Sequence, residues 1–203
     1  MSQRESGYER KERDLYETPE WVTEALHNHL PRFQQFPSLI WEPAAASGKM
    51  VKVMQTWGHL VDFSDIEGCV NKVDFFECFS TRANAIITNP PYNQAVDFLE
   101  HALRLMQQNR GLVALLLRTD FDHAASRRAF FESSAFAKKV VLTKRIVWFE
   151  NSKGSPSFNH AWFIWDWRHR GPPTIAYGPE MIDQPISEWD AMWSKPFSHP
   201  EMT

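Results

Sequence analysis

Apolar residues along the chain fall into two kinds of pattern, short continuous runs and stripes with the spacing of a helix face. The runs predict strands over residues 38–43, 59–65, 85–88 and 111–117. The stripes predict helices that begin at Thr18, Lys49 and Gln94. Because strands and helices alternate, this part of the chain predicts an α/β fold, with a parallel sheet covered by helices on both faces.

The second half of the chain predicts a different ending for the sheet. A short helix is expected over 126–131, followed by strands over 140–149 and 161–167. No helical pattern joins these two strands, so we expect them to form an antiparallel pair at the end of a mostly parallel sheet. Beyond Arg168 the sequence is rich in proline, and no long element is predicted there.

These patterns divide the chain into three parts. Residues 1–17 are polar and charged and predict a loose N-terminal arm, 18–170 predict a single domain, and 171–203 predict a proline-rich tail. A chain of 203 residues with 43% hydrophobic and 23% charged residues has the size and composition of one globular domain.

Charge and cysteine content narrow the possible partners and compartment. A formal charge of −3 argues against binding to nucleic acid by bulk electrostatics, so any such contact needs a local basic patch. Two cysteines, Cys69 and Cys78, cannot build a disulfide framework, which favours a reducing cytoplasm. No apolar run is long enough to cross a bilayer and no signal peptide opens the chain, so no membrane partner is expected.

Three segments after the predicted strands have the residues of a ligand site, since ligands of open α/β sheets bind at the carboxyl ends of strands. Glu42-Pro43-Ala44-Ala45-Ala46-Ser47-Gly48 is a turn of small residues that allows close approach to a ligand and precedes a helix N-terminus. Asp65 offers a carboxylate to the two hydroxyls of a ribose. Asp74-Phe75 sets an acid beside an aromatic ring, which suits an adenine. Each segment alone is a weak signal, because an acid after a strand is more often a solvated loop residue.

The segment Asn89-Pro90-Pro91-Tyr92 follows the predicted strand 85–88 and is a stronger signal. Two consecutive prolines fix the backbone and donate no N–H, which leaves the Asn89 amide oxygen and the Pro90 carbonyl as acceptors. Acceptors are what an exocyclic NH₂ requires, because two hydrogen bonds shape its nitrogen toward sp³ and free the lone pair for attack. Tyr92 supplies a flat face for the ring that carries the amine.

Basic pairs and aromatic residues in the second half are candidates for contact with a nucleic acid. Lys144 and Arg145 are candidates for phosphate contact, and Phe149 and Phe158 are candidates to hold a flipped base opposite Tyr92. A solvated surface for the basic residues, and core packing for the aromatic ones, are the alternatives. The eight histidines show no ligand spacing, so no metal site is predicted.

Together these segments resemble the small phage and bacterial S-adenosylmethionine-dependent DNA adenine-N6 methyltransferases, over about residues 16–167. The resemblance implies a class I (Rossmann-like) methyltransferase fold and S-adenosylmethionine as cofactor. Segment Tyr16-Glu17-Thr18-Pro19-Glu20 resembles the motif that borders the methionine end of the cofactor, and Glu42 to Gly48 resembles the cofactor loop. Asp65 resembles the ribose-binding acid, Asp74-Phe75 the adenine-binding pair, and Asn89 to Tyr92 the catalytic motif, which also borders the cofactor through Asn89.

The chain departs from this family in two respects. Ala46 stands where the family loop usually has glycine; if this position requires a positive φ, the alanine is strained by about 1–2 kcal/mol, which favours weakened rather than abolished cofactor binding. The sequence also predicts no separate target-recognition domain, so short loops, chiefly 145–158, and the tail are expected to read the DNA.

The sequence therefore predicts transfer of a methyl group from S-adenosylmethionine to the N6 amine of a flipped adenine in DNA. A second hypothesis is methylation of another planar amine, namely cytosine N4, an RNA base or a protein glutamine. A third is a binding protein that keeps the fold without turnover, and Ala46 is its main support. The absence of a Gly-x-Gly-x-x-Gly turn argues against a nicotinamide dehydrogenase.

Overall fold

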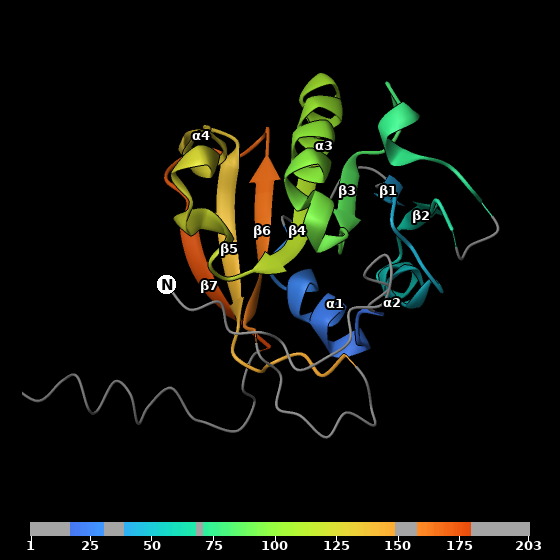
Figure 1. Cartoon of the computed structure of the whole chain (residues 1–203), viewed down its shortest axis with the longest axis horizontal. Helices are drawn as coiled ribbons and strands as arrows, with labels where there is room; N and C mark the ends of the chain where they lie inside the picture. The colour runs from blue at the N-terminus through green and yellow to red at the C-terminus, as the bar shows by residue number, and fades with distance from the viewer. Residues whose placement is uncertain (1–16, 31–38, 68–70, 149–157, 180–203) are drawn as a thin grey trace, which may run out of the picture.

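The computed structural model describes residues 17–30, 39–67, 71–148 and 158–179, and these residues form a seven-stranded sheet between two layers of helices (Figure 1). The strands lie in the order β2-β1-β3-β4-β6-β5-β7. Their bounds are β1 (Leu39–Glu42), β2 (Leu60–Phe63), β3 (Ala85–Thr88), β4 (Leu112–Arg118), β5 (Phe136–Leu142), β6 (His160–Asp166) and β7 (Thr174–Gly178).

The directions of the strands bring most of their carboxyl ends to one edge of the sheet. Strands β1 to β4 are parallel to one another, and β6 is antiparallel to both of its neighbours, β4 and β5. Strand β7 is parallel to β5. The predicted α/β fold with an antiparallel pair is thus confirmed. The carboxyl ends of every strand except β6 meet at one edge, where β6 begins, and this edge carries the candidate site.

Four α-helices among the described residues cover the two faces of the sheet. Helices α1 (Glu20–His27) and α2 (Lys49–Thr56) contribute to the core on one face, and α3 (Ala95–Asn109) and α4 (Arg128–Glu132) to the core on the other. Short 3₁₀ helices fill the connections: η1 (Phe75–Glu77), η2 (Tyr92–Gln94), η3 (Phe121–His123) and η4 (Ala125–Arg127).

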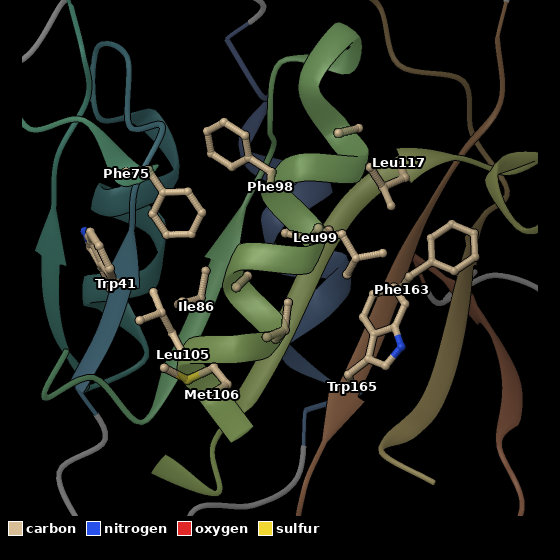
Figure 2. Packing of buried hydrophobic residues seen from close by; sticks show 14 of the residues in the cluster. Trp41, Phe75, Ile86, Phe98, Leu99, Leu105, Met106, Leu117, Phe163 and Trp165 are labelled. Carbon is tan, nitrogen blue, oxygen red and sulfur yellow. The ribbon is translucent and has the colours of Figure 1, made fainter. Parts of the chain in front are cut away.

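Alternate side chains of the central strands fill the two cores. Ile86 of β3 packs under α3, whereas its neighbour Ile87 points to the face covered by α1. Figure 2 shows Leu99 and Met106 of α3 lying over this first face, with Phe163 of β6 at the far side of the helix. Strands that are buried on both faces explain why β3 and β4 are continuous apolar runs.

The predicted strand 140–149 is wrong in position. Strand β5 starts earlier and ends at Leu142, while Ile146 turns back into the core beneath α1. Two lysines interrupt the apolar pattern in the first half of the strand, but both have partners in the structure. Lys139 forms an ion pair with Asp122 at 2.7 Å, and Lys138 donates a hydrogen bond to the His29 carbonyl. The predicted antiparallel pairing with β6 is confirmed.

Other differences concern single elements. Strand β7 lies within the segment for which no long element is predicted, because its residues are mostly exposed and lack a two-residue alternation. Helix α4 begins at Arg128 after the 3₁₀ turn η4, slightly later than predicted. Helix α1 begins at Glu20 after Pro19, and the Thr18 hydroxyl does not cap it but accepts a hydrogen bond from elsewhere.

Candidate active site

A cleft at the carboxyl edge brings together the segment before α1, the end of β1, the loop into α2 and the end of β3. Its empty space, part of which is open to solvent, is about 270 Å³. Ten residues line it: Glu17, Thr18, Glu42, Ala44, Ala45, Ala46, Ser47, Lys49, Met50 and Asn89. Five of them, Thr18, Glu42, Ala44, Ala46 and Asn89, are sequence-predicted cofactor residues, so segments far apart in the chain do converge here.

The loop from Pro43 to Gly48 has two residues in the left-handed region. Gly48, which precedes α2, has φ +81°, and Ala46 has φ +46°. The condition for strain at Ala46 is therefore met, because a Cβ at positive φ crowds the backbone. The Ala46 amide donates a 2.8 Å hydrogen bond to Asp65 Oδ2, which fixes this conformation and ties the loop to the end of β2.

Glu42 ends β1 at the floor of the cleft and is fully buried. Burial raises the pKa of its carboxyl to about 8, although the Thr88 hydroxyl and the Ala44 amide, which donates to Oε1 at 3.1 Å, act in the opposite direction. The carboxyl is therefore mostly protonated near neutral pH. A cation placed in the cleft would favour its ionised form.

Asp65 lies next to the cleft, joined to it through Ala46. Its Oδ1 accepts from the Glu67 amide at 3.0 Å, and burial raises the pKa of its carboxyl, with backbone amides partly opposing the shift. Ile66, the next residue, is an apolar side chain that is 60% exposed at this edge. No sequence pattern marks it, because an isolated isoleucine in a loop has no periodicity.

The predicted adenine pair Asp74-Phe75 is arranged differently from the expectation. Phe75 is only 3% exposed, and its ring stacks on Phe98 at 4.9 Å and meets Trp41 edge to face, as Figure 2 illustrates. The aromatic face that was expected to serve a ligand is thus turned to the core. Asp74 caps η1 by accepting from the Phe76 amide at 2.9 Å.

Asn89 follows β3 directly and is held by a contact from a distant segment. Its Nδ2 donates to the buried Thr18 hydroxyl at 3.1 Å, and this assignment directs the amide oxygen, an acceptor, to the other side. Pro91 accepts from the Gln94 amide at 2.9 Å, which closes the turn η2 that carries Tyr92. Hydrogen bonds thus hold the predicted catalytic motif at Asn89 and at Pro91, and the motif borders the cleft through Asn89.

Tyr92 is packed in an aromatic cluster that the sequence does not indicate. Its ring lies 5.7 Å from the His160 ring with an interplanar angle of 26°, and 6.4 Å from Trp148. His160 is 3% exposed, and neither ring nitrogen has a hydrogen-bond partner in the part of the chain that the structure describes. Burial, and then Arg118, lower the pKa of its imidazole to about 4, against a smaller opposing effect of Asp120.

The other predicted substrate residues are only partly placed. Phe149, like Tyr16 on the cofactor side, lies outside the described residues. Phe158 carries the Arg118 guanidinium over its ring at 4.0 Å, a contact that the sequence did not suggest. Lys144 and Arg145 are exposed; Arg145 donates to Asn159 at 3.0 Å, and the Lys144 ammonium lies 5.4 Å from the Trp21 ring centre.

The described residues contain neither a group of metal-ligating side chains nor a membrane-spanning helix. In ranges 17–30, 39–67, 71–148 and 158–179, no three histidine, cysteine or acidic side chains are grouped as metal ligands would be. None of the helices in those ranges has the length and apolar composition needed to cross a bilayer.

Comparison with solved structures identifies the fold. The methyltransferase subunit of a type I restriction-modification system from Streptococcus thermophilus matches with a TM-score of 0.60 at 15% identity, over 83% of this chain and 48% of that one. A putative class I S-adenosylmethionine-dependent methyltransferase from Listeria monocytogenes matches with a TM-score of 0.60 at 12% identity, over 87% and 69%. A modification subunit of a putative type I restriction enzyme from Vibrio vulnificus gives 0.51 at 13% identity, over 88% and 52%.

The chain therefore has the fold of the class I methyltransferases. It spans about half the length of the type I subunits that it resembles. No protein-family model matches the sequence, and no curated protein matches it either.

Proposed function

We propose that this protein transfers a methyl group from S-adenosylmethionine to the N6 amine of adenine in DNA. The observation that carries the proposal is the placement of Asn89-Pro-Pro-Tyr92 at the end of β3, with Asn89 anchored by Thr18 beside a cleft lined by small residues. The type I subunits with the same fold act in restriction-modification systems, which supports DNA as the substrate.

The residues present fit the proposed cofactor. Ala44 and Ala46 leave room for close approach of a ligand to the loop, and the buried Glu42 carboxyl offers an acceptor to the ammonium of the methionine end. Asp65 would accept from the ribose hydroxyls, and the exposed Ile66 would contact the adenine. When bound, S-adenosylmethionine supplies a methyl group on a sulfonium sulfur.

Asn89 and the proline-locked backbone then act on the target amine. The Asn89 amide oxygen and the Pro90 carbonyl accept the two amine hydrogens, so the nitrogen lone pair points toward the methyl carbon. With the cofactor bound, the nitrogen would form its bond to the methyl carbon as the carbon–sulfur bond breaks, and the electron pair of that bond would stay on sulfur. The extra proton leaves the nitrogen for solvent. Tyr92 stacks on the base, which holds the amine in line.

The DNA would lie across the same edge of the sheet. Exposed Lys144 and Arg145 would contact phosphates, and Phe158 with its Arg118 partner would help to hold the flipped base. Phosphate contacts from a few local cations agree with the slightly acidic net charge of the chain.

The direct test is to incubate the protein with methyl-labelled S-adenosylmethionine and mixed DNA, RNA and protein, and to separate the products. The proposal expects label in N6-methyladenine from DNA. Label in cytosine, RNA or glutamine would instead favour another planar amine, and saturable cofactor binding without any product would favour a binding protein.

A further inference from the structure

An ion pair lies at the mouth of the cleft. The Lys49 ammonium is 2.6 Å from Glu17 Oε2, and the side chains are 50% and 40% exposed. Lys49 is the first residue of α2, and Glu17 directly precedes Thr18, which holds Asn89. The pair therefore links the segment before α1 to the start of α2 across the cleft, and both residues line it.

Such a pair is readily exchanged for another partner. Ion pairs that are open to water are weak, because solvent screens the charges and two long side chains must be held in one geometry. Among the residues that line the cleft, Lys49 is the cation, while Glu17 and Glu42 are the acids. A ligand with a carboxylate of its own could therefore form an ion pair with the Lys49 ammonium at the mouth of the cleft.

We propose that Lys49 binds the carboxylate of the methionine end of the cofactor, and that Glu17 holds the Lys49 ammonium in place until this carboxylate takes over. The inference rests on the proposed cofactor. The amino-acid end carries one carboxylate and one ammonium, and the cleft offers a group for each: Lys49 at the mouth and Glu42 on the floor. Recognition of the two charges at once would distinguish this end from an uncharged thioether.

The proposal predicts different effects for the two partners of the ion pair, because only the loss of Lys49 should weaken binding. Lys49→Gln removes the charge at similar length and should weaken binding, whereas Lys49→Arg should restore most of it. Glu17→Gln removes the competing carboxylate and should leave binding unchanged or tighter. Lys52→Gln is the matched control, since Lys52 is exposed on the same helix and does not line the cleft.

Isothermal titration of the full chain with two ligands provides the test. S-adenosylhomocysteine carries the amino-acid end, and 5′-methylthioadenosine lacks it. For Lys49→Gln we expect the affinity for the first ligand to fall about tenfold, and the affinity for the second to stay within about twofold of the parent. For Glu17→Gln we expect the first ligand to bind equally or about two- to threefold tighter. Circular dichroism checks that each variant is folded.

Three results would overturn the inference. One is unchanged S-adenosylhomocysteine affinity in Lys49→Gln, including the case in which this variant loses DNA binding instead. A second is equal loss for both ligands, which would indicate distortion of the cleft. A third is equal weakening in Glu17→Gln and Lys49→Gln, which would make the pair a structural clamp. A parent chain that binds neither ligand would refute the proposed function itself, so the two failures are distinguishable.

Discussion

Replacement of Ala46 by glycine should stabilise the protein, although glycine usually weakens a fold. Ala46 has φ +46°, where an L-residue with a Cβ is disfavoured by about 1–2 kcal/mol and glycine is not. Glycine also gives the unfolded chain more freedom, at a cost of about 0.4–1 kcal/mol. The difference predicts a net gain of about 0.5–1 kcal/mol, which corresponds to about 1–4 °C in melting temperature for a chain of this length.

The neighbouring Ser47 provides the matched control. It is exposed, and among the described residues only Ala46 and Arg110 have a positive φ apart from glycines, so Ser47→Gly relieves no strain. We expect Ser47→Gly to lose about 0.5–1 kcal/mol. The two variants change the same loop by the same residue type, and their melting temperatures should move in opposite directions.

Urea unfolding of the parent and both variants measures the effect, with cofactor titration as a second readout. Because Ala46→Gly keeps the amide that donates to Asp65, cofactor affinity should be equal or higher. If Ala46→Gly is destabilised as much as Ser47→Gly, the left-handed conformation is not strained and the reasoning fails. If stability rises while affinity clearly falls, the alanine methyl group makes a contact with the cofactor.

Further predictions concern the acids and the aromatic cluster. In the parent, the raised pKa of Glu42 means that the neutral carboxyl stabilises the fold fully below about pH 4.5, and that this stabilisation is lost as the pH rises toward about 8. The free energy of unfolding of Glu42→Gln, which cannot ionise, should therefore rise by on the order of 3–5 kcal/mol relative to that of the parent across this pH range. Urea titrations at several pH values measure the difference. A parallel pH dependence in both proteins would contradict this. Asp65→Ala should weaken cofactor binding by about 1–3 kcal/mol and also lower stability, because the Ala46 amide loses its acceptor; unchanged affinity would make Asp65 a purely structural residue. His160→Ala should lower the free energy of unfolding by about 2–4 kcal/mol through the cavity left beneath Tyr92. His160→Phe should be as stable as the parent, since neither imidazole nitrogen has a hydrogen-bond partner among the described residues. Equal losses for the two variants in thermal unfolding would show that the imidazole makes a hydrogen bond.

The central part of the fold was predictable because its strands have a simple signal. Strands β1, β3 and β4 are buried runs that alternate with amphipathic helices, and the prediction placed them within a residue or two. Strand β5 was misplaced because its lysines find partners only in the tertiary structure. Strand β7 gave no signal because an edge strand with exposed residues resembles a loop.

The candidate site divides in the same way. Motif residues such as Glu42 and Asn89 could be proposed from the sequence because each lies at the carboxyl end of a recognisable strand. Contacts between residues distant in sequence could not be predicted, because they depend on packing between elements. Examples are the stacking of His160 on Tyr92, the ion pair of Lys49 with Glu17, and the burial of Phe75. Sequence spacing carries no information about such pairs.

The central claim is that the Asn89 amide oxygen activates a target amine, and single-turnover methyl transfer by Asn89→Ala tests it most directly. Loss of an acceptor that matters most in the transition state should lower the rate by on the order of 10²-fold at saturating cofactor, with cofactor affinity within a few-fold of the parent. Because Asn89 also donates to Thr18, thermal unfolding of the variant must first show that it is folded. A folded Asn89→Ala protein that methylates adenine at the parent rate would contradict the account.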